Sequence, residues 1–327
     1  MENILSTYSR QIPGRTVSVI VVSCQKEGLL SDCLLSVSRQ THPFVECLVF
    51  LNCACQEDLS RWQKRFPAFK FFYFTDNQLY CRPNNEGIRI SSGEYVLCLN
   101  DDVALSPSYI DEAVKIMEAD SAFGMLSGCL FRPDGKTVDS AGLVWSKCRK
   151  PHDRGYGMKP SKPYPAGPVF GVNGAAAFYR RKMLEEVKDV GGYFDESYGI
   201  YYEDLDLSWR ARRMGWKAVF NPASVAIHKR GATTRIEESG LPGFFSRFAF
   251  VKLPHDLKVR HVRNRYATMI KNDRLWAFLL DLPWILFYEA RLFIYLAFFD
   301  RRVLRDLACD TGFFSSAFAK RKGSGNG

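Results

Sequence analysis

The chain has 327 residues, of which 46% are hydrophobic and 24% charged. This composition excludes a disordered or fibrous protein and allows one large domain with an appendage. The net charge of +10 is unevenly distributed, because the residues from Val251 onward hold fourteen Lys and Arg against seven Asp and Glu. A basic tail of this kind indicates an anionic partner, either membrane phospholipid or nucleic acid. Ten cysteines without a secretory signal peptide favour a reducing compartment.

The first hundred residues alternate between apolar runs and stretches with helical spacing. Residues 1–15 have no periodic pattern and are expected to be a loose lead-in. The runs predicted to be buried strands are 17–23, 46–51, 70–74 and 94–99, and the predicted helices are 29–37 and 59–66. Strands that alternate with helices imply right-handed crossovers and a parallel sheet, so this half is expected to be a doubly wound α/β fold. Ligands bind such sheets beyond the carboxyl ends of the strands.

Three polar residues, Asn100, Asp101 and Asp102, directly follow the fourth predicted strand. Two adjacent carboxylates do not both enter a core without a counter-charge. At the end of a strand they can hold a hard divalent cation through oxygen ligands. A simple turn is the alternative, since Asn and Asp favour turns and a helix is expected soon after Pro107. The preceding segment 82–87 is rich in groups that can bind phosphate or hydroxyl.

Further strands are expected at 123–129 and 137–145, the second of them antiparallel, with a hairpin turn at 133–136 between them. Residues 147–168 hold several Pro, Gly, Lys and Arg and are predicted to form a mobile loop, long enough to be a lid over a site. In 169–179, Gly171 and Gly174 lie among small residues, where the backbone can come close to a ligand.

Residues 191–216 hold five carboxylates among aromatic side chains rather than among Lys or Ser. From Asp204 onward the apolar residues recur at helical spacing, and Gly215 is expected to end that helix. Glu203 or Asp204 can serve as a helix cap, but capping does not account for all five acids. A strand at 218–226 then leads to His228, whose imidazole can be a metal ligand or an ordinary histidine.

In order and spacing, five motifs resemble the family 2 glycosyltransferases, which are inverting nucleotide-sugar enzymes with the GT-A fold. The likeness covers about residues 17–234 and is greatest to rhamnosyltransferase-like bacterial enzymes of cell-surface polysaccharide synthesis. The motifs are Cys33-Leu34-x-Ser36-Val37-x-x-Gln40-Thr41-x-Pro43, Leu99-Asn100-Asp101-Asp102, Gly191-Gly192-Tyr193-Phe194-Asp195-Glu196, Glu203-Asp204-x-Asp206-Leu207, and His228.

The resemblance implies a role for each matching residue. Asp102 matches the last acid of the DxD-type motif, which holds Mg²⁺ or Mn²⁺ against the donor's diphosphate, and His228 matches a histidine that reaches the metal in some relatives. Asp204 matches the acid taken as the catalytic base, with Glu203 beside it. The residues expected on the donor side are Ser23, Asn52, Arg82, Asn85, Asn100 and Asp101, and those on the acceptor side are Gly174 and Trp209.

Three positions differ from the family's pattern, and all of them lie on the nucleotide-binding half. Leu51, followed by Asn52, stands where the second strand usually ends in an acid that reads the nucleobase. Ser23-Cys24-Gln25 replaces the usual Thr-Tyr-Asn, and a glycine expected near Leu79 is missing. A catalytically degenerate protein is therefore an alternative to an active enzyme.

The C-terminal region, 236–327, is basic and rich in aromatic residues. Residues 275–299 are apolar but are interrupted by Asp281, Pro283, Glu289 and Arg291, so no run is expected to span a membrane. A helix pair lying in the inner membrane surface fits this composition, and a helical appendage packed on the catalytic domain or on a second subunit is the alternative. Residues 320–327 are expected to be disordered.

The sequence thus predicts a GT-A domain at 16–235 that transfers a sugar from a nucleotide-diphosphate donor, dTDP- or UDP-linked, to a cell-surface glycan or lipid-linked acceptor. The enzyme is expected in the cytoplasm, peripheral at the inner face of the cytoplasmic membrane, and able to form a homo-oligomer. The competing class is a basic protein that binds membrane or nucleic acid without catalysis. Acids at strand ends argue against nucleic acid, because they repel phosphate unless a metal is bound.

Overall fold

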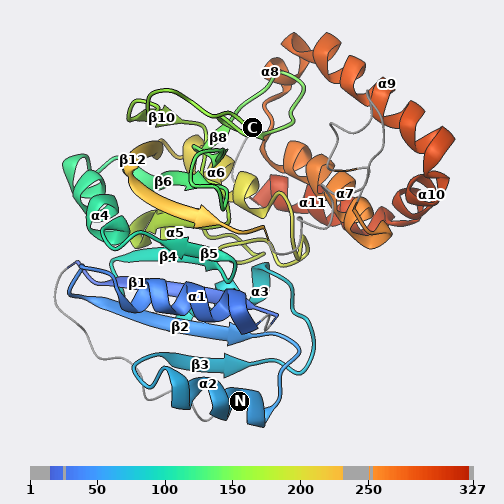
Figure 1. The fold of residues 1–327 in the computed structure, drawn as a ribbon. Helices are drawn as coiled ribbons and strands as arrows, with labels where there is room; N and C mark the ends of the chain where they lie inside the picture. The colour runs from blue at the N-terminus through green and yellow to red at the C-terminus, as the bar shows by residue number, and fades with distance from the viewer. Residues whose placement is uncertain (1–14, 25–26, 231–249, 251–252, 324–327) are drawn as a thin grey trace.

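A computed structural model of the chain describes residues 15–24, 27–230, 250 and 253–323 (Figure 1). The predicted lead-in lies almost wholly outside these residues, and so does the predicted domain boundary between residues 235 and 236.

A sheet of ten strands forms the centre of the described part, with β10-β12-β6-β11-β4-β1-β2-β3 as its main order (Figure 1). Its parallel half contains β1 (Val17–Ser23), β2 (Val45–Leu51), β3 (Lys70–Tyr73) and β4 (Tyr95–Asn100). In the other half, β11 (Ala176–Arg180) runs antiparallel between β4 and β6 (Phe123–Phe131), and β12 (Lys217–His228) runs parallel to β6. The shorter strands are β5 (Val103–Leu105), β7 (Val138–Ser140) and β10 (Gly167–Val169), with β8 (Leu143–Val144) and β9 (His152–Asp153) forming a separate pair.

Helices cover both faces of the sheet and enclose two hydrophobic cores. One core packs α1 (Glu27–Ser38), α2 (Gln56–Arg65) and α4 (Tyr109–Ala119) against Val17, Val19 and Val21 of β1. The other packs α3 (Cys81–Ile90), α5 (Arg181–Val187) and α6 (Glu203–Arg213) against Ile20 and its neighbours. Alternate side chains of β1 thus enter different cores, which explains why its sequence is continuously apolar.

All four predicted strands of the first hundred residues are confirmed, but helix α3 was not predicted. The segment contains Pro83 and Gly87, which are poor helix formers. Gly87 is needed here because a Cβ atom on it would lie 2.6 Å from Cγ2 of Ile20. The close contact between α3 and β1 therefore requires glycine at position 87, although glycine has a low helix propensity.

The predicted mobile loop at 147–168 is in part fixed. β9 pairs with β8, and the buried Arg149 side chain forms ion pairs with Asp273 and Asp281 of the C-terminal region. These contacts join distant parts of the chain, so local composition could not show them.

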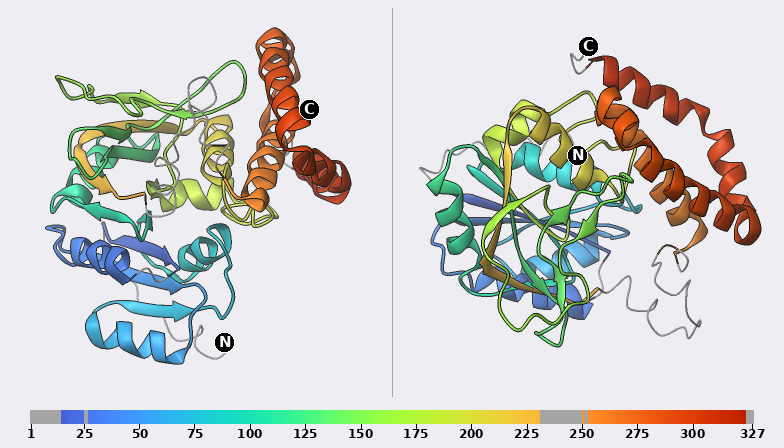
Figure 2. Two further views of the ribbon diagram at one scale, coloured as in Figure 1. Left: turned by 45° about the vertical axis from the view of Figure 1, so that its right-hand side comes forward. Right: turned by 90° about the horizontal axis from the view of Figure 1, so that it is seen from above.

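Five helices make up the described C-terminal region: α7 (His255–Asn272), α8 (Leu275–Leu280), α9 (Leu282–Phe299), α10 (Arg301–Cys309) and α11 (Thr311–Gly323). α7 packs on α6, and α11 packs on α7, whereas α8 and α9 extend away from the sheet (Figure 2). The prediction of disorder at 320–327 is wrong for residues 320–323, which belong to α11. The remaining residues, 324–327, lie outside the described part.

The prediction that no segment is apolar enough to span a membrane is also wrong by length and composition. α9 has 18 residues with a mean hydropathy of 1.4, which makes it the one such candidate in the described residues. Glu289 and Arg291 interrupt the apolar run, but the aromatic and aliphatic residues around them outweigh their effect on the mean. Only Ile285 and Leu296 of this helix are buried.

Candidate active site

Asp102 and His228 come together where β4 ends. β5 pairs antiparallel with β12 so that Val103 lies opposite His228, and the N–H of Lys229 donates to the Asp102 carbonyl oxygen at 2.8 Å. This pairing places His228 Nε2 3.3 Å from Asp102 Oδ1. Two residues that are far apart in sequence therefore present a carboxylate and an imidazole at one point on the carboxyl edge of the sheet.

A third residue, Asp139, orients the histidine from behind. Its fully buried carboxylate lies 2.7 Å from His228 Nδ1 and also pairs with the Arg230 guanidinium. Burial alone lowers the pKa of His228, but hydrogen bonds to Asp102 and Asp139 outweigh burial and raise that pKa to about 9. Asp139 could not be predicted from the sequence, because nothing in an acid within a predicted strand indicates that it faces a histidine.

The Asp102–His228 pair suits a divalent cation that takes its other ligands from the substrate. In the part of the chain that the structure describes, no group of three or more His, Cys, Asp or Glu side chains is arranged so that it could hold a metal ion. Mg²⁺ commonly binds through one or two carboxylates together with substrate phosphates and water, so two protein ligands are sufficient. Asp102 and Asp139 favour the protonated form of His228. Nε2 must lose its proton before it can bind a metal ion.

Asp204 is presented by the first turn of α6. Its Oδ2 accepts a hydrogen bond from the N–H of Gly174 at 2.9 Å, and its Oδ1 accepts one from the N–H of Leu205 at 2.7 Å. Burial, assisted by the nearby carboxylate of Asp153, raises the pKa of Asp204 to about 6. A carboxyl group with this pKa is ionised near neutral pH and is a stronger base than an ordinary aspartate.

The Asp204 carboxylate and the Asp102–His228 pair belong to one edge of the sheet. Gly174, which binds Asp204, is followed by Ala175, whose carbonyl oxygen accepts the N–H of Asn100 at 2.9 Å. Asn100 is the last residue of β4 and stands two residues before Asp102. A single strand pairing therefore connects the segment that holds the candidate base with the segment that holds the candidate metal ligand.

Glu203 lies beside Asp204 but differs in its surroundings. Its side chain is buried, and Oε2 has no hydrogen-bond partner among the described residues. Burial and the charge of Asp204 raise the pKa of Glu203 well above its usual range. Neither acid caps the helix through its side chain, because the cap position is Tyr202, which has a left-handed backbone with φ of 71°.

On the donor side, the predicted residues mainly bind other parts of the protein. Asp101 accepts a hydrogen bond from Ser23 Oγ at 2.6 Å, which ties the end of β1 to the end of β4. The buried Asn52 side chain donates to the Leu79 carbonyl oxygen and accepts the N–H of Gln78, each at 3.1 Å. Leu79 has φ of 57°, so the backbone there has the left-handed conformation that favours the glycine missing from the family pattern.

Arg82 and Asn85 point in different directions from α3. Arg82 is exposed and donates to Gln78 Oε1 at 2.9 Å. Asn85 is buried, and its amide binds both the N–H and the carbonyl oxygen of Phe194, each at 2.8 Å. Asn85 therefore holds the loop before α6, and only Arg82 of this pair extends into solvent.

Trp209 belongs to an aromatic cluster on the other side of α6. Its ring lies 4.3 Å from that of Trp145 in an edge-on arrangement, and Trp145 stacks on Phe170 at 4.6 Å. The cluster connects α6 with the segment that follows β8. The side chain is half-buried, and its predicted role on the acceptor side stays a prediction.

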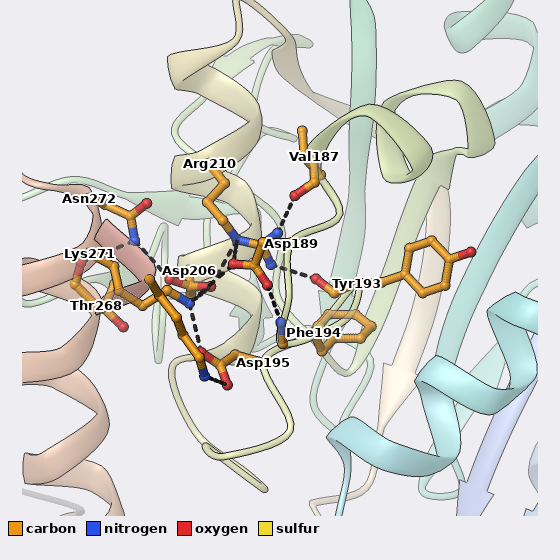
Figure 3. Close-up of polar contacts among 12 residues, drawn as sticks. Val187, Asp189, Tyr193, Phe194, Asp195, Asp206, Arg210, Thr268, Lys271 and Asn272 are labelled. Atoms are coloured by element: carbon orange, nitrogen blue, oxygen red, sulfur yellow. Dashed lines mark hydrogen bonds and ion pairs between the residues drawn. The ribbon is translucent and has the colours of Figure 1, made fainter. Parts of the chain in front are cut away.

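Two acids of the segment 191–216, Asp195 and Asp206, are structural. Lys271 of α7 lies 2.8 Å from Asp195 Oδ2 and 2.9 Å from Asp206 Oδ2, and Arg210 binds Asp206 at 3.0 Å (Figure 3). Lys320 of α11 adds a second cation 2.6 Å from Asp195. Through these ion pairs, Asp195 and Asp206 dock the C-terminal helices onto α6 and the loop before it.

Sequence comparison places this arrangement among known proteins. Residues 18–188 match the family described as glycosyl transferase family 2. An O-antigen biosynthesis protein of Myxococcus xanthus is 27% identical over 68% of this chain and 18% of its own length. An N-acetylglucosaminyl-diphospho-decaprenol L-rhamnosyltransferase of Mycobacterium tuberculosis is 28% identical over 43% of this chain and 48% of its own. A low-salt glycan biosynthesis hexosyltransferase of Haloferax volcanii is 27% identical over 68% of this chain and 70% of its own length. The chain thus matches less than half of the length of the first two relatives.

Structural comparison gives the same fold at lower sequence identity. GalNAc-T7 with UDP, GalNAc and Mn²⁺ matches 78% of this chain and 48% of its own with a TM-score of 0.57 and 14% identity. S. aureus TarS 1-349 in complex with UDP-GlcNAc matches 79% of this chain and 68% of its own, with a TM-score of 0.52 and 15% identity. At this identity the likeness establishes the fold, which is GT-A. Together with the family match over residues 18–188, it shows that the chain belongs to glycosyl transferase family 2.

Proposed function

We propose that the protein is an inverting glycosyltransferase that moves a hexosyl or deoxyhexosyl group from a dTDP- or UDP-sugar to a hydroxyl of a cell-surface glycan or lipid-linked acceptor. Asp204 is the general base in this proposal. Asp102 and His228 are the ligands of Mn²⁺ or Mg²⁺. The observation that carries the proposal is the geometry: the N–H of Gly174 binds the Asp204 carboxylate, and the next residue, Ala175, pairs with Asn100 of the Asp102 segment. The raised pKa of Asp204, about 6, supports it.

The two groups have separate tasks in a single displacement. Asp102 and His228 would hold a divalent cation, which would supply positive charge to offset the charge that develops on the leaving diphosphate. Asp204 accepts the proton of the acceptor hydroxyl as the new glycosidic bond forms. The donor's bond to the diphosphate breaks on the opposite face of the sugar, which inverts the anomeric centre without a covalent intermediate. The N–H of Gly174 holds Asp204 in position for this proton transfer.

Donor hydrolysis with Mn²⁺, compared between the wild type and Asp102→Ala, tests the enzyme assignment. We expect metal-dependent hydrolysis by the wild type and its loss in the variant. Equal, metal-independent hydrolysis in both proteins would contradict the proposal and favour a degenerate or non-catalytic protein. The buried Leu51 at the end of β2 is the observation that keeps this alternative open, because no carboxylate is present there to read a nucleobase.

Asp204→Asn tests the base. The amide preserves the shape of the side chain but cannot take up a proton, so transfer should be abolished while donor binding stays nearly intact. The thermal shift that the donor produces in the presence of Mn²⁺ measures donor binding, because a ligand that binds only the folded state raises the unfolding temperature. Loss of this shift in the variant would assign Asp204 to donor binding instead.

We further propose that the enzyme is cytoplasmic and sits at the inner face of the cytoplasmic membrane. The exposed apolar residues of α8 and α9 support this, as does the lipid-linked substrate in the name of the Mycobacterium tuberculosis relative. Because α9 also meets the length and hydropathy of a spanning helix, alkaline carbonate extraction of membranes is the test. Release by carbonate supports the peripheral location, and retention with the lipid contradicts it.

A further inference from the structure

A pocket of about 520 Å³ lies between helix α9 and the loop that follows β8. We refer to it as the α9 pocket. Its walls combine aromatic rings with cations, and the lining residues are Ser146, Lys147, Cys148, Trp284, Phe287, Tyr288 and Arg291. None of the roles assigned above uses this pocket.

The cations of the α9 pocket lie over its aromatic rings. The Lys147 ammonium is 5.7 Å from the centre of the Trp284 ring, and the Arg291 guanidinium is 5.8 Å from that of Phe287. A third cation, Lys150, lies 6.0 Å from the ring of Tyr288. Burial lowers the pKa of Lys150, and the charge of Arg291 lowers it further. The surroundings of the pocket are therefore electropositive.

The two acids nearest in sequence to this pocket are engaged with other cations. Asp281 Oδ2 lies 2.6 Å from Arg149 Nη1, and Glu289 Oε1 lies 2.5 Å from Arg265 Nη1. Several cations that lie beside aromatic rings favour an anion with an apolar part, and a phosphate group best matches several cations at once.

Next to the α9 pocket, α8 and α9 extend away from the sheet domain (Figure 2). Both helices expose large hydrophobic side chains. The large hydrophobic residues exposed on these two helices are Leu275, Trp276, Leu279, Leu280, Trp284, Leu286, Phe287, Phe293, Ile294, Phe298 and Phe299. Contiguous apolar patches of this kind mark protein or membrane contacts. Basic residues beside exposed Trp and Phe favour the membrane surface.

The loop that lines the α9 pocket also contacts helix α6, whose first residues are the acids Glu203 and Asp204. Trp145, at the start of the loop that lines the pocket, contacts Trp209 of the same helix.

We propose that the α9 pocket binds the phosphate group of a membrane lipid, with Lys147 and Arg291 on the phosphate and the lipid chain along Trp284, Phe287 and the exposed face of α9.

Calorimetric titration with a soluble short-chain lipid phosphate, dihexanoyl phosphatidic acid, tests the site on the full chain. We expect saturable binding to the wild type and about 30-fold weaker binding to Lys147→Glu/Arg291→Glu, because each cation near a lipid phosphate contributes about fivefold. Inorganic phosphate should bind at least about tenfold more weakly than the lipid, since it gains nothing from the apolar wall. The control is Arg301→Glu/Arg302→Glu, which makes the same change of charge on exposed residues of α10.

Three outcomes overturn the proposal: no binding of the lipid to the wild type, equal binding of inorganic phosphate, or an equal loss in the α10 control. Without lipid binding there is no site, and equal binding of inorganic phosphate would mean a general anion site. An equal loss in the α10 control would mean that the overall positive charge of the protein, and not the pocket, attracts the lipid. The thermal shift with donor and Mn²⁺, measured on the same samples, separates this inference from the proposed function. Its absence in the wild type counts against the glycosyltransferase function, whereas lipid binding tests only the pocket.

Discussion

Replacing Lys271 by methionine tests whether the C-terminal helices hold α6 in place. The Lys271 side chain is 4% exposed and lies between Asp195 and Asp206, at 2.8 and 2.9 Å (Figure 3). Methionine has a similar length and fills the same space, so the variant removes the charge and the hydrogen bonds while changing the packing little. Two carboxylates, 1% and 0% exposed, are then left with fewer partners.

The expected loss of unfolding free energy follows from the contacts that remain. Removing one partner from a buried ion pair costs about 3–5 kcal/mol. Asp195 keeps Lys320 at 2.6 Å, and Asp206 keeps Arg210 at 3.0 Å, so neither carboxylate is stranded. These remaining cations place the expected loss at the lower end, at about 3 kcal/mol.

The loss should also depend on pH in a defined direction. Burial raises the pKa of Asp195, but Lys271 and Lys320 outweigh burial and hold this pKa well below its usual range. A folded-state pKa below the unfolded value of about 3.9 means that the ion pair stabilises the protein above that pH and loses its effect as the pH falls. The difference between wild type and variant should therefore shrink in acid.

Urea unfolding followed by tryptophan fluorescence measures both effects, at neutral pH and at about pH 3. The control is Lys217→Met, because Lys217 forms an exposed ion pair with Asp120 at 3.2 Å and its removal should cost less than about 1 kcal/mol. A loss in the Lys271 variant no larger than in the control would refute the reasoning. So would a loss that is the same size at both pH values.

The other predictions concern the site and its packing. With a base of pKa about 6, kcat/KM should fall as the pH drops below that value. Asp153→Asn should move this fall to lower pH, because it removes a negative charge that adds to the effect of burial on the pKa of Asp204. An unchanged pH profile of kcat/KM would contradict the assignment of Asp204 as the base. Asp139→Asn should weaken the binding of Mn²⁺ about 10–100-fold, because the histidine ligand loses the carboxylate that orients it. A metal titration of the donor-induced thermal shift measures this affinity, and an unaltered affinity would show that His228 is not a metal ligand. Gly128→Ala should lower the unfolding free energy by at least about 1 kcal/mol in urea titrations, since the new Cβ meets the carbonyl oxygen of Ser224 at 2.3 Å, and a neutral effect argues against this packing.

The parallel half of the fold could be predicted because each of its strands is buried on both faces. β1 and β4 are continuous apolar runs, and turns or helical patterns bound them. α3 could not be predicted in the same way, since Pro83 and Gly87 belong to a helix that tertiary contact with Ile20 stabilises. Local propensity favours other structures there, and the contact that overrides it lies more than sixty residues away in the chain.

The candidate site divides along the same line. Asp102 and His228 could be singled out because each ends or follows a strand at the edge where ligands bind a parallel sheet. Asp204 could be singled out because it matches the family motif, and the roles of all three residues stay predictions. Asp139 could not be singled out, because its partner is 89 residues away and no periodic pattern marks the pair. The high density of acids in 191–216 marked the segment as unusual. One of these acids, Asp206, pairs with Lys271, and the local sequence does not indicate that distant partner.

The Lys271 and Lys320 contacts also set the order in which the molecule is completed during synthesis. Asp195 leaves the ribosome 76 residues before Lys271 and 125 residues before Lys320. Until those residues emerge, the sheet can form and Asp206 has Arg210 as its partner, but Asp195 lacks the two lysines that allow it to be buried. The loop that leads into α6 is therefore completed only when almost the whole chain exists. We expect a nascent chain ending near residue 235 to contain a folded sheet and an unfinished active site.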